Sequence, residues 1–156
     1  MTLSEQTAPP QTDSISLEFD LLHRPEKVWR ALTEPALLAQ WLLPVAGLAL
    51  EPGAAFTFQT QPHPEWDGVV NCRIVEIEAK RKLSYTWQVG DMALDTVVTF
   101  TLIPTDFGTR LSLLHSGFKP EQKRNLNGAR YGWKMMGAKL VELLASESTF
   151  SHGRSA

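Results

Sequence analysis

The feature that most constrains the fold of this chain is a single long amphipathic helix near its C-terminal end. Over residues 120–146, apolar side chains recur at spacings of three and four, which is the repeat of one helix face. Gly128, Gly132 and Gly137 each cost about 1 kcal/mol relative to alanine in a helix interior. Glycine also allows another backbone or a ligand to approach closely. The predicted apolar stripe consists of Leu126, Ala129, Trp133, Met136, Leu140, Leu143 and Leu144.

Six segments before this helix show the patterns of short strands. In the first of them, Ile15, Leu17 and Phe19 alternate with polar residues, as in a strand that buries one face. Turn-forming glycine, proline and aspartate residues separate most of the segments. The predicted strands are residues 14–22, 55–60, 69–79, 83–89, 95–104 and 109–117.

Two short helices are predicted between the first and second strands. Pro25 suits the first position of a helix, and Pro35 blocks continuation of that helix while opening the next one. The second helix places Trp41 on its apolar face and ends before Pro44.

This order of elements indicates an α+β protein. A sheet with one apolar face must be covered, and the last helix is the only long one available. We therefore expect a helix-grip fold. In it, a curved six-stranded antiparallel sheet carries two short helices after strand one, and the long C-terminal helix packs across the concave face. An apolar pocket is expected between sheet and helix.

Composition limits which binding partners and which cellular compartment we expect. The formal net charge of −2 leaves no excess of basic residues to neutralise phosphates, so we expect no nucleic-acid partner. Cys72 is the only cysteine, which prevents an intramolecular disulfide and favours a reducing, cytoplasmic location. No apolar segment approaches the length of a membrane span, and residues 1–13 lack the pattern of a signal peptide.

The length favours one domain. We place it at residues 14–146, with a disordered N-terminal tail at 1–13 and a C-terminal tail at 147–156. The sequence leaves open whether the protein is a monomer or a homodimer.

The third predicted strand has an ambiguous register. If Glu76 and Glu78 face water, then Asn71 and Arg73 face inward and could give the pocket polar anchors. A bulge in this strand would reverse part of that assignment.

No catalytic or metal-binding constellation is evident. No serine lies in a nucleophile-elbow glycine pattern, and Cys72 falls within a strand, where a buried thiol is the expected role. The four histidines show no short metal-ligand spacing, so neither a metal nor a cofactor is expected. His115 falls on the inward face of the sixth strand. It is either a satisfied histidine near the strand end or a polar group of the pocket.

Aromatic residues are the main candidates for lining the pocket. Trp29, Trp41, Trp87 and Trp133 occupy apolar faces, where core packing and pocket lining are both compatible with the pattern. Trp66 lies in a loop and could cap the pocket mouth or join an interface.

Several segments resemble a known family. They are residues 25–35, with Leu38 to Trp41, then 83–87, 98–102 and 108–111, His115 to Phe118, and Gly132-Trp133 followed by Leu140. Together they are similar to the SRPBCC (START-like) superfamily, and specifically to the C-terminal domain of the activator of the heat-shock-protein-90 ATPase. The chain departs from that family in residues 79–82 and 120–128.

The resemblance implies a helix-grip scaffold that binds a small hydrophobic or amphipathic ligand, with a stress-related role. It also leaves open a chaperone-interacting co-factor, or a cyclase or hydrolase on the same scaffold, because a fold does not fix a function. We expect a non-enzymatic binding protein, since no acid-base pair can be assigned. The predicted ligand contacts are Trp41, Trp66, Asn71, Arg73, Tyr85, Trp87, Phe100, His115, Phe118, Trp133 and Met136.

Overall fold

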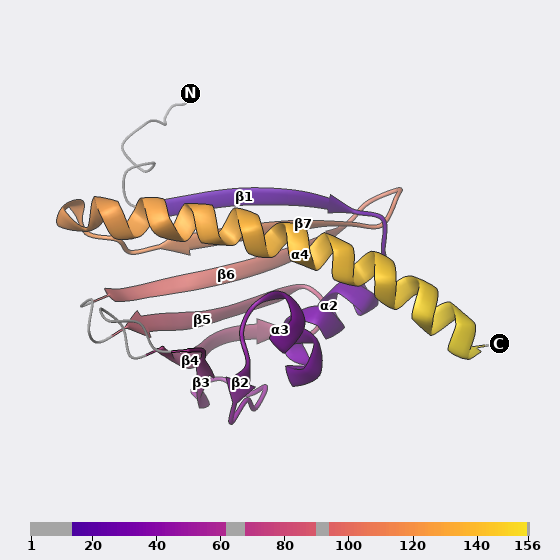
Figure 1. Ribbon diagram of the computed structural model, residues 1–156, viewed down its shortest axis with the longest axis horizontal. Coiled ribbons are helices and arrows are strands. Elements are labelled where there is room, and N and C mark those ends of the chain that lie inside the picture. Colours follow the sequence, from indigo (N-terminus) through magenta and orange to yellow (C-terminus); the bar gives the residue numbers. More distant parts are fainter. Residues whose placement is uncertain (1–13, 62–67, 90–93, 156) are drawn as a thin grey trace.

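The computed structural model describes residues 14–61, 68–89 and 94–155 of the chain (Figure 1). Within them, one antiparallel sheet of seven strands has the order β1-β7-β6-β5-β4-β3-β2. The strands are β1 Ser14–Leu21, β2 Val45–Ala46, β3 Ala55–Gln59, β4 Val69–Glu78, β5 Lys82–Val89, β6 Leu94–Pro104 and β7 Thr109–Ser116. The helices are α2 Pro25–Thr33, α3 Pro35–Trp41, the 3-10 turn η3 Pro120–Gln122 and α4 Lys123–Ser155.

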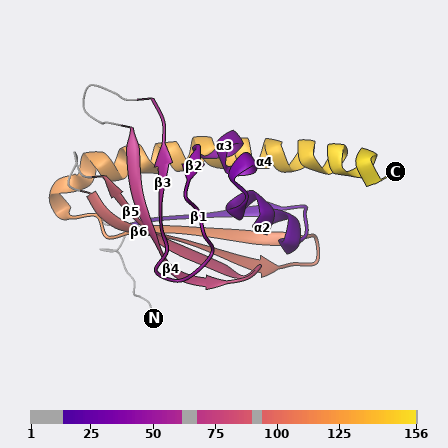
Figure 2. The ribbon, with the colours of Figure 1, turned by 90° about the horizontal axis from the view of Figure 1, so that it is seen from below.

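The helices cover one face of the sheet. Figure 1 shows α4 running along the side of β1 and β7, while α2 and α3 lie over the remaining strands. Seen from below, sheet and helices form two layers (Figure 2). This is the α+β, helix-grip arrangement expected from the sequence. No helix of the described segments is long and apolar enough to cross a bilayer.

The prediction of six strands was wrong by one. The additional strand, β2, has only two residues, which pair as Val45↔Phe58 and Ala46↔Thr57 at the edge of the sheet. A two-residue strand is too short to show the alternation by which strands are recognised in a sequence.

The inward orientation expected for Asn71 and Arg73 was also wrong. The register of β4 against β5 shifts between Ile74 and Glu76, which marks a bulge. Before this shift Cys72 and Ile74 are buried, whereas Asn71 and Arg73 are exposed on the opposite face. Arg73 there donates a hydrogen bond from Nη1 to the carbonyl oxygen of Gly53 at 2.7 Å.

The long helix continues past its predicted end. We expected a tail from residue 147, but α4 extends to Ser155. The segment 145–152 contains neither proline nor glycine, so no residue type that commonly ends a helix intervenes. The predicted N-terminal tail, residues 1–13, lies outside the described residues.

Contacts between distant segments fix α4 on the sheet. Lys27 of α2 donates a hydrogen bond from Nζ to the carbonyl oxygen of Leu144 at 2.6 Å. A β-carbon on Gly137 would overlap the ring of Phe19, so glycine lets α4 approach β1 closely. The position of α4 therefore depends on both neighbours.

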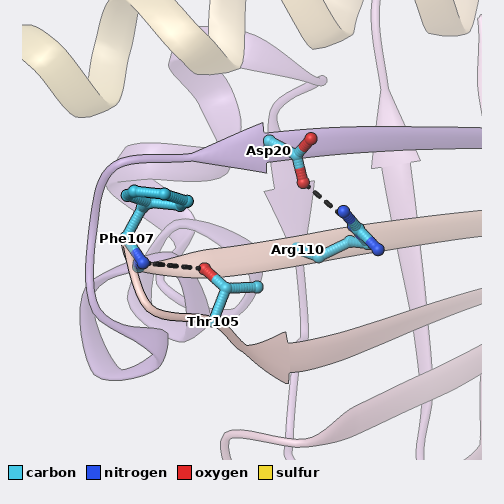
Figure 3. A network of polar contacts seen from close by, with 5 residues as sticks. Asp20, Thr105, Phe107 and Arg110 are labelled. Carbon is cyan, nitrogen blue, oxygen red and sulfur yellow. Dashed lines mark hydrogen bonds and ion pairs between the residues drawn. The ribbon is translucent and has the colours of Figure 1, made fainter.

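Polar contacts hold the hairpin between β6 and β7 and the adjacent part of β1 (Figure 3). The Thr105 hydroxyl accepts hydrogen bonds from the backbone N–H groups of Phe107, at 3.3 Å, and Gly108, at 3.0 Å. Next to this turn, Arg110 of β7 donates from Nε to Oδ1 of Asp20 in β1 at 2.9 Å. This pair joins the edge strand β1 to its neighbour at an exposed position.

Candidate functional site

A cavity of about 410 Å³ lies between α4 and the sheet. The sheet contributes side chains from three strands, and Leu43 after α3 closes one side. Most of the lining is apolar, as is typical of sites for small molecules. The lining residues are Leu43, Val70, Trp87, Val89, His115, Arg124, Asn125, Gly128, Ala129, Gly132, Trp133 and Met136.

The helix side of the cavity owes its space to two glycines. Gly128 and Gly132 lie one turn apart on the face of α4 that lines the cavity. A β-carbon on Gly128 would have no heavy atom within 4 Å, and one on Gly132 would meet only the terminal methyl of Met136, at 3.7 Å. The glycines thus leave open volume where larger side chains would fill it.

His115 forms the centre of a buried hydrogen-bond chain. Trp133 donates from its indole Nε1 to Nδ1 of His115 at 2.9 Å. Because an indole nitrogen only donates, Nδ1 must accept, and the proton of the neutral ring is on Nε2. Nε2 lies 2.7 Å from the hydroxyl oxygen of Thr96, which in turn donates to the carbonyl oxygen of Trp87 at 2.9 Å. Every donor in this series of hydrogen bonds therefore has an acceptor.

Aromatic rings enclose the imidazole. The ring centroid of His115 is 4.7 Å from that of Phe118 and 5.8 Å from that of Trp87. Trp87 of β5 and Trp133 of α4, which both line the cavity, have ring centroids 5.5 Å apart. Burial in these surroundings lowers the pKa of His115 to about 4, so the ring is neutral at pH 7.

A second aromatic layer lies in the core beside the cavity. Tyr85 and Phe100 are each 2% exposed, with ring centroids 6.1 Å apart. Trp41 packs edge-on against Phe100 and donates from Nε1 to the carbonyl oxygen of Ala31 at 2.8 Å. Burial, and secondarily the neighbouring Cys72, raise the pKa of Tyr85 well above its ordinary value. These rings do not line the cavity, although Phe100 contacts the lining residue Trp133, with ring centroids 6.0 Å apart.

The sequence profile described as "Activator of Hsp90 ATPase homolog 1-like protein" matches residues 23–145 of the chain. The chain belongs to this family. The match confirms the resemblance to the SRPBCC superfamily noted in the sequence. No curated protein matches the chain.

Solved structures of similar proteins share the fold. Protein MLL2253 from Mesorhizobium loti is 38% identical, with a TM-score of 0.79, and the similarity covers 85% of this chain and 97% of that one. NE0264 from Nitrosomonas europaea is 24% identical, with a TM-score of 0.73 over 90% and 99% of the two chains. CalU16 from Micromonospora echinospora is 23% identical, with a TM-score of 0.67 over 87% and 77%. The last two likenesses concern the fold alone.

Four of the eleven predicted ligand contacts line the cavity of this Activator of Hsp90 ATPase homolog 1-like domain. They are Trp87, His115, Trp133 and Met136.

Six other predicted contacts lie elsewhere, and one cannot be placed. Trp41, Tyr85, Phe100 and Phe118 are buried in the core, while Asn71 and Arg73 lie on the opposite face of the sheet. Trp66 lies outside the described residues.

Sequence reasoning missed the polar rim and part of the wall. Arg124 and Asn125 lie in the first turn of α4, within a segment that matched no family pattern in the sequence. The glycines of α4 gave the available signal, because their spacing of four residues places Gly128 and Gly132 on one helix face. Arg124 is one further turn before Gly128 on the same face, so this extension could have been made from the sequence.

The described residues offer no group of three or more His, Cys, Asp and Glu side chains that could hold a metal ion. Cys72 is buried, and burial raises its pKa to about 12, so the thiol is protonated at neutral pH. It is poorly suited to act as a nucleophile.

Proposed function

We propose that the protein binds a small apolar or amphipathic molecule in the cavity between the sheet and α4. The observation that carries this proposal is an apolar cavity of about 410 Å³ with a polar group at only a few positions of its wall. Cavities of this size and lining are the usual sites for small ligands. Membership of a family built on this scaffold supports the proposal.

The glycines and tryptophans of the wall suit a ligand with a flat or extended apolar body. Gly128 and Gly132 remove side-chain volume from the helix. Trp87 and Trp133 face this space with large apolar rings, and such rings provide much contact area with little loss of side-chain entropy. A ligand lying against α4 would touch both rings.

We propose binding rather than catalysis. His115 and Arg124 are the ionisable side chains among the described lining residues. Both ring nitrogens of His115 are engaged within the protein, and arginine does not lose its proton in proteins, so neither group is poised to act as a general base. Cys72 as the only cysteine is compatible with a reducing compartment, and we propose that binding takes place in the cytoplasm.

Fluorescence titration with N-phenyl-1-naphthylamine, a neutral apolar probe, tests the proposal. The probe should bind saturably and quench tryptophan emission, because two tryptophans line the cavity. Gly128→Leu should place its side chain into open cavity space. The loss of about 1.4 kcal/mol of apolar contact between probe and wall weakens binding ten-fold, so we expect a reduction of roughly ten-fold or more.

Ala138→Leu is the matched control. Ala138 is on the exposed face of the same helix and does not line the cavity. This variant adds the same side chain to α4 and should bind the probe like the wild type. Absence of saturable binding to the wild type, or equal binding by the two variants, would contradict the proposal. Native mass spectrometry of the purified protein adds a direct search for a retained ligand.

A second candidate function is interaction with a chaperone, which the family description favours. In this case the protein would bind the chaperone of its own organism and change its ATPase rate. A pull-down combined with an ATPase assay tests this candidate. No association and no change in rate at micromolar protein would reject it.

A further inference from the structure

We propose that the ligand of this cavity is an apolar carboxylic acid whose carboxylate pairs with Arg124. This inference rests on the proposed function, since it concerns the chemistry of the molecule that fills the same cavity. It predicts a preference for an acid over a neutral ester of the same carbon skeleton.

Arg124 is the charged side chain on the cavity wall, if His115 is counted as neutral. Within the part of the chain that the structure describes, no hydrogen bond or ion pair engages its guanidinium. The four ion pairs of these residues use other cations, namely Arg30, Arg81, Lys82 and Arg110. Arg124 is therefore available to an anion that enters the cavity.

The start of α4 favours an anion at this place. The N-terminal end of a helix carries partial positive charge, so acidic residues are stabilising there and basic ones are not. The first turn of α4 contains Lys123 and Arg124 but no acidic residue. Glu121, in the preceding turn, forms no ion pair with Arg124. A bound carboxylate would offset this accumulation of positive charge.

The geometry of α4 separates a charged end from an apolar body. Arg124, Gly128, Gly132 and Met136 follow each other at intervals of four residues, so they lie along one helix face. From the first to the last of them the helix rises about 18 Å. The apolar chain of a ligand can lie in the space over the glycines, against Trp133, with its head at Arg124.

Arginine suits this role because its planar guanidinium binds a carboxylate through two parallel hydrogen bonds. The remaining polar groups of the wall do not compete for it. His115 is satisfied internally, and Asn125 carries no charge. The carboxylate therefore has one cationic partner in the cavity, at its rim.

Displacement of N-phenyl-1-naphthylamine by dodecanoic acid and by methyl dodecanoate tests this inference. At pH 7.5 and low salt, the acid should bind the wild type roughly five- to ten-fold more tightly than the ester, given a charge-assisted pair near the surface. Raising the ionic strength to about 0.5 M should weaken binding of the acid and leave that of the ester unchanged.

Arg124→Gln should remove the preference for the acid without weakening the ester. Lys123→Gln is the matched control, because it removes one positive charge from the same helix turn at a residue that does not line the cavity. This control should keep the preference within about two-fold of the wild type. Both substitutions are at exposed positions, and urea denaturation checks that each variant is folded.

The outcomes separate the two proposals. Saturable binding of probe and ester without preference for the acid would overturn the carboxylate and leave the apolar site standing. Equal preferences in Arg124→Gln and Lys123→Gln would overturn the role of Arg124. Failure of probe, ester and acid alike to bind the wild type would overturn both the site and the carboxylate.

Discussion

Acidification should destabilise this protein, and the more deeply buried of the two histidines with a lowered pKa, His115, should contribute most of the histidine effect. In the folded state its pKa is lowered to about 4, whereas an unfolded chain gives histidine a pKa near 6.5. Between these values the unfolded state binds more protons than the folded state, so stability rises with pH. The contribution of His115 is therefore fully present above pH 6.5 and is lost as the pH falls toward 4.

The structure explains why the folded state resists protonation. A proton on Nδ1 would replace the hydrogen bond from the Trp133 indole with two opposed donors, in surroundings formed by Phe118 and Trp87. The expected loss is about 1.4 kcal/mol per pH unit within this window, or about 3 kcal/mol in total. Domains of this size are commonly stable by about 5–15 kcal/mol, so the effect is easily measured.

Urea denaturation of the wild type and His115→Gln between pH 7.5 and 4.5 measures it. Glutamine does not titrate, so the variant should lose the His115 part of the pH dependence. At pH 7.5 it should be about 1–3 kcal/mol less stable, because the buried indole N–H loses its acceptor. His23→Gln is the comparison variant: burial and then Lys27 also lower the pKa of His23, but at a less buried position, so this variant should lose less of the pH dependence than His115→Gln. Equal slopes for the wild type and His115→Gln below pH 6.5 would refute the hydrogen-bond chain.

Three further predictions concern packing. Trp133→Ala should cost about 3–5 kcal/mol in urea denaturation and also weaken probe binding, because the ring is both buried and part of the cavity wall. Gly137→Ala should destabilise the protein by about 1–3 kcal/mol, because the new β-carbon clashes with the Phe19 ring. Gly128→Ala should be neutral or stabilising by up to about 1 kcal/mol, because its β-carbon meets no other atom. Equal effects of the two substitutions would contradict the close approach of α4 to β1. Cys72 should react with a thiol reagent only in denaturant, given its burial and its pKa of about 12, and rapid labelling of the folded protein would contradict this.

The sequence predicted most elements because their patterns are local. The period of two in β1, and the prolines that begin α2 and α3, are properties of neighbouring residues. The inward positions of Leu83 and Tyr85 in β5 follow from the same alternation, and the structure confirms them. Trp87 lies on that face too, but it is only half-buried, because part of its ring borders the cavity.

The incorrect sequence predictions concern features that depend on contacts between segments far apart in the chain. The orientation of Asn71 and Arg73 depends on a bulge, which is a property of the pairing of β4 with β5 and leaves no mark in the sequence of β4 alone. The edge strand β2 exists only because β3 offers it hydrogen bonds. Similarly, the two alternatives for His115 could not be separated until Trp133 was placed against it.

The sequence by itself thus determined the order of the elements, their apolar faces and the long helix that covers the sheet, since side-chain periodicity and turn residues act over a few residues. Only the tertiary structure decided where sheet and helix leave a cavity, that Trp41, Tyr85 and Phe100 lie outside its lining, and that Arg124 lies at its rim. A cavity is the volume that packing leaves unfilled, so it depends on the distances between elements far apart in the chain and not on the residues of any one of them.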